Sequence, residues 1–323
     1  MMKLTTFTTR TATVLLGTAL AFSINLQTQA QEDQGALSFE ETMVVVNANA
    51  GDMEGLQESL QGISSDQAMA VMGRIAAERS GTERVTILSN ITTALTSNSA
   101  PGDLPGLANR IMNTVVGRSG GDVDVARETM RALMSSSANN PAVQELSDDD
   151  RTNTVSDVAN NAAAGAVGAG EAAGMDEGPL TDVAGAVADG AYQAVGQVPT
   201  PVSDLEPVSN RMVNGGVSAA AEEHRSGVAQ AMMAATARIQ DDELRNRAVL
   251  GTVNGSGEAG GDDVAAAAQQ TIPEGAQPPE PTTGDEAPGE QEPQPEPETP
   301  AGPEPEVPQE PVDPVQPQDA SPI

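Results

Sequence analysis

The only histidine of the chain stands in the sequence Glu222-Glu223-His224-Arg225, next to two carboxylates and a guanidinium group. A histidine beside a carboxylate suits acid–base catalysis, and histidine is also a frequent metal ligand. Catalysis would need a carboxylate that orients the ring, and a metal would need two or three more ligands at matched spacing. Successive residues of a helix point about 100° apart, so these four side chains do not converge on one atom. The pattern therefore favours a solvated helix face over a site.

Two runs of aspartate, Asp148-Asp149-Asp150 and Asp262-Asp263, could bind calcium, which prefers carboxylate oxygens. Neither run has the alternating acidic residues and the distant glutamate of an EF-hand loop. The first run stands where a loop or a helix N-cap is expected. We therefore predict diffuse cation binding by the acidic surface and no specific metal site.

The residue types that most enzyme chemistry requires are scarce. The chain has no cysteine, and Lys3 is its only lysine. Thiol catalysis, zinc–thiolate sites and iron–sulfur clusters are therefore excluded. We find no Gly-x-Ser-x-Gly, no phosphate loop ending in Gly-Lys-Ser/Thr, no His-Glu-x-x-His, and no Gly-x-Gly-x-x-Gly after a strand. The sequence predicts no catalytic, cofactor-binding or metal site, and no cofactor.

Residues 1–30 have the three parts of a secretory signal peptide. Lys3 and Arg10 give a positive start, residues 12–24 are mostly apolar, and Thr28-Gln29-Ala30 forms a small-x-small cleavage site. The apolar part is too short to span a bilayer well, and no later span is predicted. We therefore expect export by a bacterium, to the periplasm or the medium, with residues 31–36 as a polar lead.

The charge balance restricts the partners. The chain has 47 acidic and 15 basic residues, for a net charge of −32. Such a chain is repelled by nucleic acid and by anionic lipid surfaces. Cationic proteins and divalent cations remain suitable partners.

Apolar residues recur at helical spacing through residues 37–255, and strict alternation is almost absent. We therefore predict an all-α domain there, built of short antiparallel helical hairpins with Leu, Ile, Val, Met and Ala in the core. Asp241-Asp242 is typical of an N-cap, with Glu243 and Arg247 paired one turn apart behind it. The stripes are Val85, Leu88, Ile91 and Leu95; Leu107, Ile111, Met112, Val115 and Val116; Val123, Ala126, Met130, Leu133 and Met134; and Val228, Met232, Ala235 and Ile239.

A shift of 39 residues places Arg79-Ser80-Gly81 on Arg118-Ser119-Gly120, and Ile91 and Leu95 on Met130 and Met134. This period lies in the range of helical-repeat arrays. An Asn-Arg pair also recurs at residues 109–110, 210–211 and 246–247. Two interpretations stay open: a tandem repeat of about 39 residues, or short helices with Ser-Gly turns that look alike by chance.

Residues 158–196 are dominated by alanine and glycine. Gly170 and Gly174 have the spacing at which helices can approach closely. The uncharged run is too short and too polar to span a membrane. Because each interior glycine costs about 1 kcal/mol against alanine, we expect this segment to be the loosest part of the domain.

Residues 256–323 change character, since they hold most of the 23 prolines together with many acids. Such a segment buries too little apolar area to offset its chain entropy. We predict a disordered, extended tail biased to polyproline II.

These observations favour an exported, non-enzymatic protein of the bacterial envelope or exterior, a helical interaction module with an acidic spacer tail. Its partners would be other envelope or extracellular proteins, with weak binding of divalent cations, no nucleic acid and no membrane span after signal cleavage. Two alternatives stay open: a hydrolase of unrecognised family that uses acidic residues, and a low-affinity divalent-cation-binding protein. Turnover abolished by one Asp or Glu substitution would identify the first, and saturable calcium binding the second.

Overall fold

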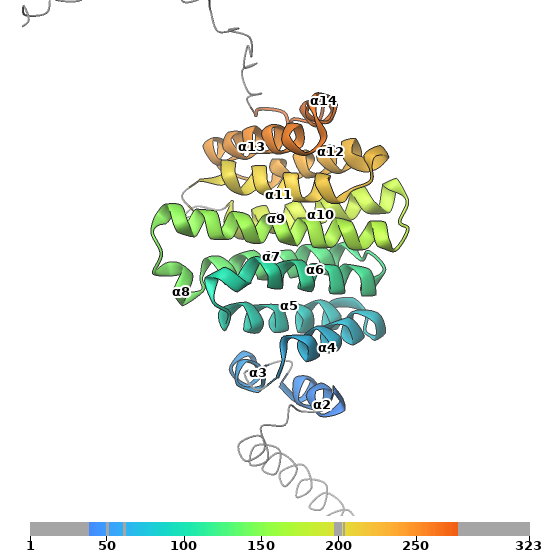
Figure 1. Cartoon of the computed structure of the whole chain (residues 1–323), viewed down its shortest axis with the longest axis vertical. Coiled ribbons are helices and arrows are strands. Elements are labelled where there is room, and N and C mark those ends of the chain that lie inside the picture. Colours follow the sequence, from blue (N-terminus) through green and yellow to red (C-terminus); the bar gives the residue numbers. More distant parts are fainter. Residues whose placement is uncertain (1–38, 50–51, 61–62, 197–201, 203, 277–323) are drawn as a thin grey trace, which may run out of the picture. The chain divides into compact units, whose positions relative to one another are not determined.

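The computed structural model describes residues 39–49, 52–60, 63–196, 202 and 204–276 (Figure 1). Every regular element in these residues is a helix, which confirms the predicted all-α class of short antiparallel hairpins. None of the helices in these ranges is long and apolar enough to cross a bilayer. The predicted signal peptide, the polar lead and residues 277–323 of the predicted tail lie outside the described residues.

The helices form two layers around one core, and each helix packs against the next member of its own layer (Figure 1). The first layer comprises α2 (Phe39–Asn49), α4 (Ser65–Glu78), α6 (Leu104–Ser119), α9 (Asp148–Ala172), α11 (Leu205–Ala219) and α13 (Asp242–Gly260). The second comprises α3 (Met53–Leu60), α5 (Gly81–Ser97), α7 (Val123–Ala138), α10 (Glu177–Val195), α12 (Arg225–Ala235) and α14 (Asp262–Gln269). Short elements join them: α8 (Pro141–Gln144), η1 (Pro101–Asp103), η2 (Glu222–His224) and η3 (Thr236–Arg238).

The predicted helical stripes coincide with α5, α6, α7 and α12 with η3, and most of their residues are buried. The predicted N-cap is also confirmed, because the Asp241 side chain accepts the Leu244 amide at 2.9 Å and Arg247 pairs with Glu243 at 3.0 Å. The largest buried side chain is Tyr192, whose hydroxyl donates to Ser209 at 3.1 Å. Around it the core consists of small and medium aliphatic residues.

Helices of the first layer approach until their backbones touch. A Cβ added at Gly165 of α9 would lie less than 3.0 Å from the carbonyl oxygen of Asn109 in α6. Gly215 of α11 faces the Asn160 carbonyl of α9 in the same way. Gly255 of α13 likewise faces the carbonyl of Asn210 in α11. Only glycine permits this approach, which places its Cα hydrogen against a carbonyl oxygen.

The same three asparagines also tie the layer together through their side chains. Asn109 Nδ2 donates to the Asn161 carbonyl at 3.1 Å, and Asn160 Nδ2 donates to the Arg211 carbonyl at 2.9 Å. Asn210 Nδ2 donates to Glu258 Oε1 of α13 at 3.1 Å. Each asparagine therefore binds the following helix of the layer.

The arginine of each recurring Asn-Arg pair reaches in the opposite direction along the layer. Arg110 of α6 pairs with Asp66 of α4, and Arg211 of α11 pairs with Asp157 of α9. Arg247 of α13 lies 3.4 Å from Asp204, the N-cap of α11. The recurrence in the sequence thus marks a contact that recurs between helices.

The 39-residue spacing relates only one pair of hairpins. The first-layer helices from α4 onward begin at residues 65, 104, 148, 205 and 242, so only the first step is 39 residues long. All three Arg-Ser-Gly sequences lie where the chain passes from the first layer to the second: between α4 and α5, at the end of α6, and at residues 225–227, where α12 begins. A tandem repeat of the sequence itself stays a prediction.

The structure differs from our expectation of a loose segment at 158–196. This segment forms the second half of α9 and all of α10, and many of its residues are completely buried. Its glycines replace side-chain packing by backbone contact, which helix propensity alone does not register. Gly170, near the end of α9, packs against Leu180 of α10, and Gly174 has φ +68° in the turn between these two helices.

The helical part also extends beyond the predicted boundary at residue 255. Helix α13 continues to Gly260, and α14 follows as an alanine-rich helix whose Val264 and Ala268 are buried. Residues 256–269 are therefore part of the helical stack and not of the tail. The predicted boundary is wrong there because residues 265–268 are four consecutive alanines, which show no helical periodicity of large apolar side chains.

The backbone contacts can be tested by adding one methyl group. We expect Gly165→Ala and Gly215→Ala each to lower the free energy of unfolding by about 1–3 kcal/mol, because the new Cβ meets a carbonyl oxygen. Gly168→Ala in the same α9 is the matched control, since no atom lies within 4 Å of its Cβ position. It should stabilise the protein by about 0.5–1 kcal/mol. Urea unfolding followed by far-UV circular dichroism measures both, and equal effects at Gly165 and Gly168 would contradict the contact.

Candidate functional site

A hollow of about 760 Å³ opens on the first layer where α4, α6 and α9 meet. Its floor is made of small residues from all three helices. Gly73 brings α4 close to α6, because a Cβ there would lie 3.3 Å from Thr114 Cγ2. Gly117 brings α6 close to α9, because a Cβ there would lie 3.7 Å from Ala169 Cβ. The lining residues are Phe39, Met69, Ala70, Gly73, Arg74, Ala77, Asn113, Thr114, Gly117, Arg118, Ala169, Ala172 and Ala173.

Two successive turns of α6 present three polar side chains to this hollow: Asn113, Thr114 and Arg118. None of the three makes a hydrogen bond or ion pair with another residue of the described ranges. Arg118 is exposed, and its stem lies over Gly73, with Cγ 3.5 Å from the Cβ position there. The amide, hydroxyl and guanidinium together can donate several hydrogen bonds to an acceptor in the hollow.

The second arginine of the hollow is fully engaged. Arg74 Nη1 lies 3.1 Å from Glu40 Oε1, and Arg74 Nε lies 3.1 Å from Glu78 Oε1. Its guanidinium also lies 5.4 Å from the centre of the Phe39 ring, within the range of a cation–π contact. The hydrogen bonds that Arg74 donates to Glu78 and Glu40 raise its pKa above the usual arginine value. Arg74 thus anchors α2 at the edge of the hollow, whereas Arg118 is left unpaired.

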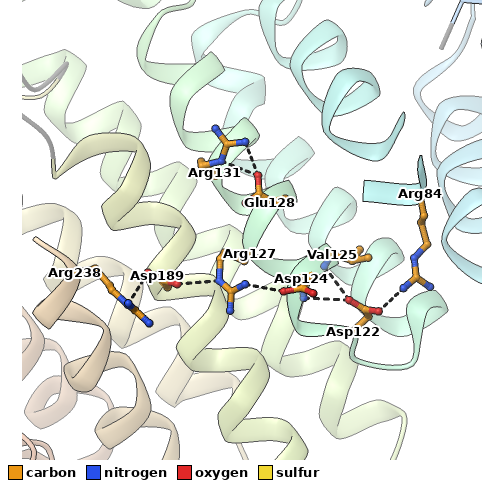
Figure 2. Close-up of polar contacts among 9 residues, drawn as sticks. All are labelled: Arg84, Asp122, Asp124, Val125, Arg127, Glu128, Arg131, Asp189 and Arg238. Carbon is orange, nitrogen blue, oxygen red and sulfur yellow. Dashed lines mark hydrogen bonds and ion pairs between the residues drawn. The ribbon is translucent and has the colours of Figure 1, made fainter. Parts of the chain in front are cut away.

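Charged side chains form a chain across the second layer, which Figure 2 shows from Arg84 to Arg238. Arg84 of α5 pairs with Asp122, the N-cap of α7. Further along, Arg127 of α7 bridges Asp124 Oδ1 and Asp189 Oδ2 of α10, each at 2.8 Å. Arg238 Nε of η3 lies 3.6 Å from Asp189 Oδ1.

Two side chains of this chain are mostly buried, Arg84 at one end and Asp189 near the other. The side chain of Asp189 is 11% exposed and that of Arg127 is 30% exposed. Each carboxylate has an arginine beside it, so the chain is charge-compensated along its length. This arrangement positions α5, α7 and α10 against one another, and we assign it a structural role.

The predicted solvated face at 222–225 is wrong in the case of His224. The segment Glu222–His224 forms the short element η2, and His224 Nδ1 lies 2.9 Å from Glu171 Oε1 at the end of α9. The same oxygen accepts the Ala221 amide at 2.8 Å. The His224 side chain is only 20% exposed. It ties the connection between α11 and α12 to α9.

The contact between His224 and Glu171 changes the pKa of both side chains. The hydrogen bond to the Glu171 carboxylate raises the pKa of His224 above 6.5 against the opposing effect of burial, and Glu223 and Glu177 add to the rise. Burial alone would raise the pKa of Glu171, but the hydrogen bonds from His224 and the Ala221 amide outweigh it and lower this pKa below 4.5. The pair is therefore strongest where Glu171 is ionised and His224 is protonated.

The aspartate runs lie in helix starts. Asp148–Asp150 form the first turn of α9 behind the N-cap Ser147, and Asp262-Asp263 begin α14. Acidic side chains are stabilised at this position by the helix dipole. Within the described ranges, no three His, Cys, Asp or Glu side chains gather in a group that could hold a metal ion.

No protein-family model matches the sequence, and a search of curated proteins finds no match.

The hollow has no counterpart among the sequence motifs. In the sequence Arg118 belongs to an Arg-Ser-Gly turn, and no motif includes Asn113 or Thr114. The signal that was present is the composition of α6, where polar Asn113, Thr114 and Arg118 interrupt a helix rich in aliphatic residues. That they lack partners depends on α4 and α9, which no local pattern predicts.

The charged chain predicts a stability effect. Asp189→Asn leaves two arginines without their shared carboxylate, so the free energy of unfolding should fall by about 1.5–3 kcal/mol. Glu128→Gln is the control, because its partner Arg131 on the same α7 is 48% exposed and the pair should contribute less than about 1 kcal/mol. Chemical unfolding of both variants measures the free energy of unfolding. Similar decreases in the two variants would contradict a structural role for Asp189.

The His224–Glu171 pair predicts a pH dependence. The pKa of His224 is raised on folding, so its contribution is complete below 6.5 and disappears as the pH rises through the folded value. The pKa of Glu171 is lowered, so its contribution exists above 4.5 and disappears as the pH falls through the folded value. The pair should stabilise the protein most between these values.

Urea unfolding of the protein and of His224→Gln measures this at about pH 5.5 and about pH 8.5. The variant should be less stable than the parent at the lower pH and should differ less from it at the higher pH. Glu171→Gln should give the same pattern. A difference between parent and variant that does not change with pH would contradict the pairing.

Proposed function

We propose that this chain is an exported, non-enzymatic helical module that binds another protein of the bacterial envelope or exterior through its first layer. The observation that carries this proposal is the hollow at α4, α6 and α9, with three unpaired polar side chains over a floor of alanine and glycine. Such a surface offers directional hydrogen bonds beside apolar area, as protein interfaces do.

The other polar side chains of the first layer support the hollow as the binding surface. Asn109, Asn160 and Asn210 each donate to a neighbouring helix, and Arg110 and Arg211 are in ion pairs. These polar groups are already used in holding the layer together. The side chains of Asn113, Thr114 and Arg118 are not, so their hydrogen bonds remain for a partner.

The charges of the chain indicate which chemical group a partner would present at the hollow. The chain has 47 acidic residues, and yet Arg118 stands without a carboxylate partner among the described residues. A guanidinium fork matches a carboxylate in a bidentate geometry. The proposed partner therefore presents a carboxylate at the hollow, although its other surfaces have to tolerate a strongly acidic protein.

Crosslinking from defined positions tests this function. Because the chain has no cysteine, Ala70→Cys places a single thiol in the hollow, and Ala266→Cys on α14 places one outside it. Each variant carries a photoreactive crosslinker and is added to native envelope extract. We expect a protein that is crosslinked from position 70 and not from 266, and that is lost when Arg118→Glu is added.

The variants must unfold at the temperature of the parent for the comparison to hold. The same products from both positions, or crosslinking that survives Arg118→Glu, would contradict binding at the hollow. Turnover of a defined substrate that one Asp or Glu substitution abolishes would overturn the non-enzymatic assignment.

A further inference from the structure

The last turn of α9 has the hollow on one side and the His224 contact on another. Three alanines at this end of the helix line the hollow: Ala169, Ala172 and Ala173. Glu171 stands among them in the sequence, but its carboxylate binds His224 and the Ala221 amide, in the connection between α11 and α12. The position of this turn therefore affects the shape of the hollow, and the Glu171 side chain attaches the turn to another part of the stack.

The residues around Glu171 have little else with which to hold this turn in place. Residues 168–174 read Gly-Ala-Gly-Glu-Ala-Ala-Gly, so Glu171 is the only one of the seven with a side chain larger than a methyl group. Residues 172–174 are exposed, and Leu180 packs against Gly170. Alanine and glycine bury little apolar area and have no side-chain hydrogen bonds. The turn therefore depends on Glu171 for a directional attachment.

We propose that the hydrogen bond between Glu171 and His224 is a pH-sensitive latch, which holds the last turn of α9 to the connection between α11 and α12 and thereby sets the shape of the hollow. When His224 loses its proton, the latch loosens, the turn moves more freely, and the hollow binds its partner less tightly. The effect on binding rests on the proposed function, whereas the movement of the turn does not.

The charges around the histidine determine the direction of the switch. Three carboxylates act on the ring: Glu171 from α9, Glu177 from α10 and Glu223 from its own element η2. Arg225, which begins α12, has no ion pair within the described residues. The hydrogen bond to Glu171 and the charges of the three carboxylates raise the pKa of His224 above 6.5 against the effect of burial. The latch is therefore closed below pH 6.5 and opens as the pH rises through the folded value.

Loss of the proton weakens the contact for three reasons. The imidazolium attracts the carboxylate across 2.9 Å, and the neutral ring keeps a hydrogen bond without this attraction. The ionised Glu171, whose side chain is 21% exposed, is then left without a positive charge beside it. A positive charge near the end of α9 also compensates the negative end of the helix dipole. The attachment of the turn is therefore weaker at high pH.

Spin labels on α6 and on the last turn of α9 test the latch without a partner. The chain has no cysteine, so Gly106→Cys and Ala172→Cys give one defined pair, and no atom lies within 4 Å of the Cβ position at Gly106. We expect a narrow distance distribution at about pH 5.5 and the loss of this narrow distribution at about pH 8.5. In His224→Gln, which does not titrate, the distribution should be the same at both pH values.

A second labelled pair is the matched control. Gly106→Cys with Asp149→Cys joins the same α6 to the first turn of α9, far from the latch in the sequence. Its distribution should stay narrow at both pH values. Each labelled protein must unfold at the temperature of the parent for the comparison to hold.

Crosslinking from Ala70→Cys in native envelope extract measures the consequence for binding. The yield from the protein with His224, divided by the yield from His224→Gln at the same pH, cancels any pH response of the partner. This ratio should fall about two- to fivefold between about pH 5.5 and about pH 8.5, since a partly exposed pair gives a coupling at or below the low end of the usual range.

A parent distribution that does not change with pH, or that changes equally in His224→Gln, would overturn the proposal. A crosslinking ratio that does not change with pH would overturn the effect of the latch on the hollow. If the spin labels show the latch and no protein is crosslinked at either pH, the proposed function is wrong and the latch stands.

Discussion

Backbone contact between neighbouring helices of the first layer is the constraint on which the rest of the structure depends. Where a glycine faces a carbonyl oxygen, the two helices lie closer than any side chain would allow. This closeness lets an asparagine amide cross to the next helix and form a hydrogen bond with its backbone. It also limits the core to side chains of modest size, which explains how a chain with 1% aromatic residues packs a core. The register between helices follows, because each asparagine must meet both its glycine and its acceptor.

Arginine provides the long-range electrostatic ties. The chain has about three times as many acids as bases, and most arginines of the described helices pair with a carboxylate. In the first layer Arg110 and Arg211 each reach back by one helix. In the second layer Arg127 holds α7 to α10 through Asp189. Among the described residues, Arg118 and Arg225 have no ion pair with a carboxylate, and of these two Arg118 lines the hollow.

The local part of the fold could be predicted from the sequence. Apolar spacing locates α5, α6 and α7, and the N-cap at Asp241 follows from residue type and position. The buried role of residues 158–196 could not be predicted, because a propensity scale counts glycine as a cost, whereas Gly165 acts through a carbonyl 56 positions away in the sequence. The pairing of His224 with Glu171 joins residues 53 positions apart and leaves no local signal. The hollow is formed by three helices that are distant in the sequence. Which of its polar side chains lack a partner therefore depends on how these helices pack.

The succession of helix pairs also determines how the protein would respond to a pulling force. Every extensive contact joins helices of one pair or of adjacent pairs, so stability is approximately a sum over neighbours. Helix α9 has the most extensive contacts, with α6 and α11, whereas α2 and α3 contribute few. A load applied between the two ends would therefore detach pairs one after another, beginning at α2 and reaching α9 last. The chain would lengthen in discrete steps, one helix pair at a time, while its central helices stay folded.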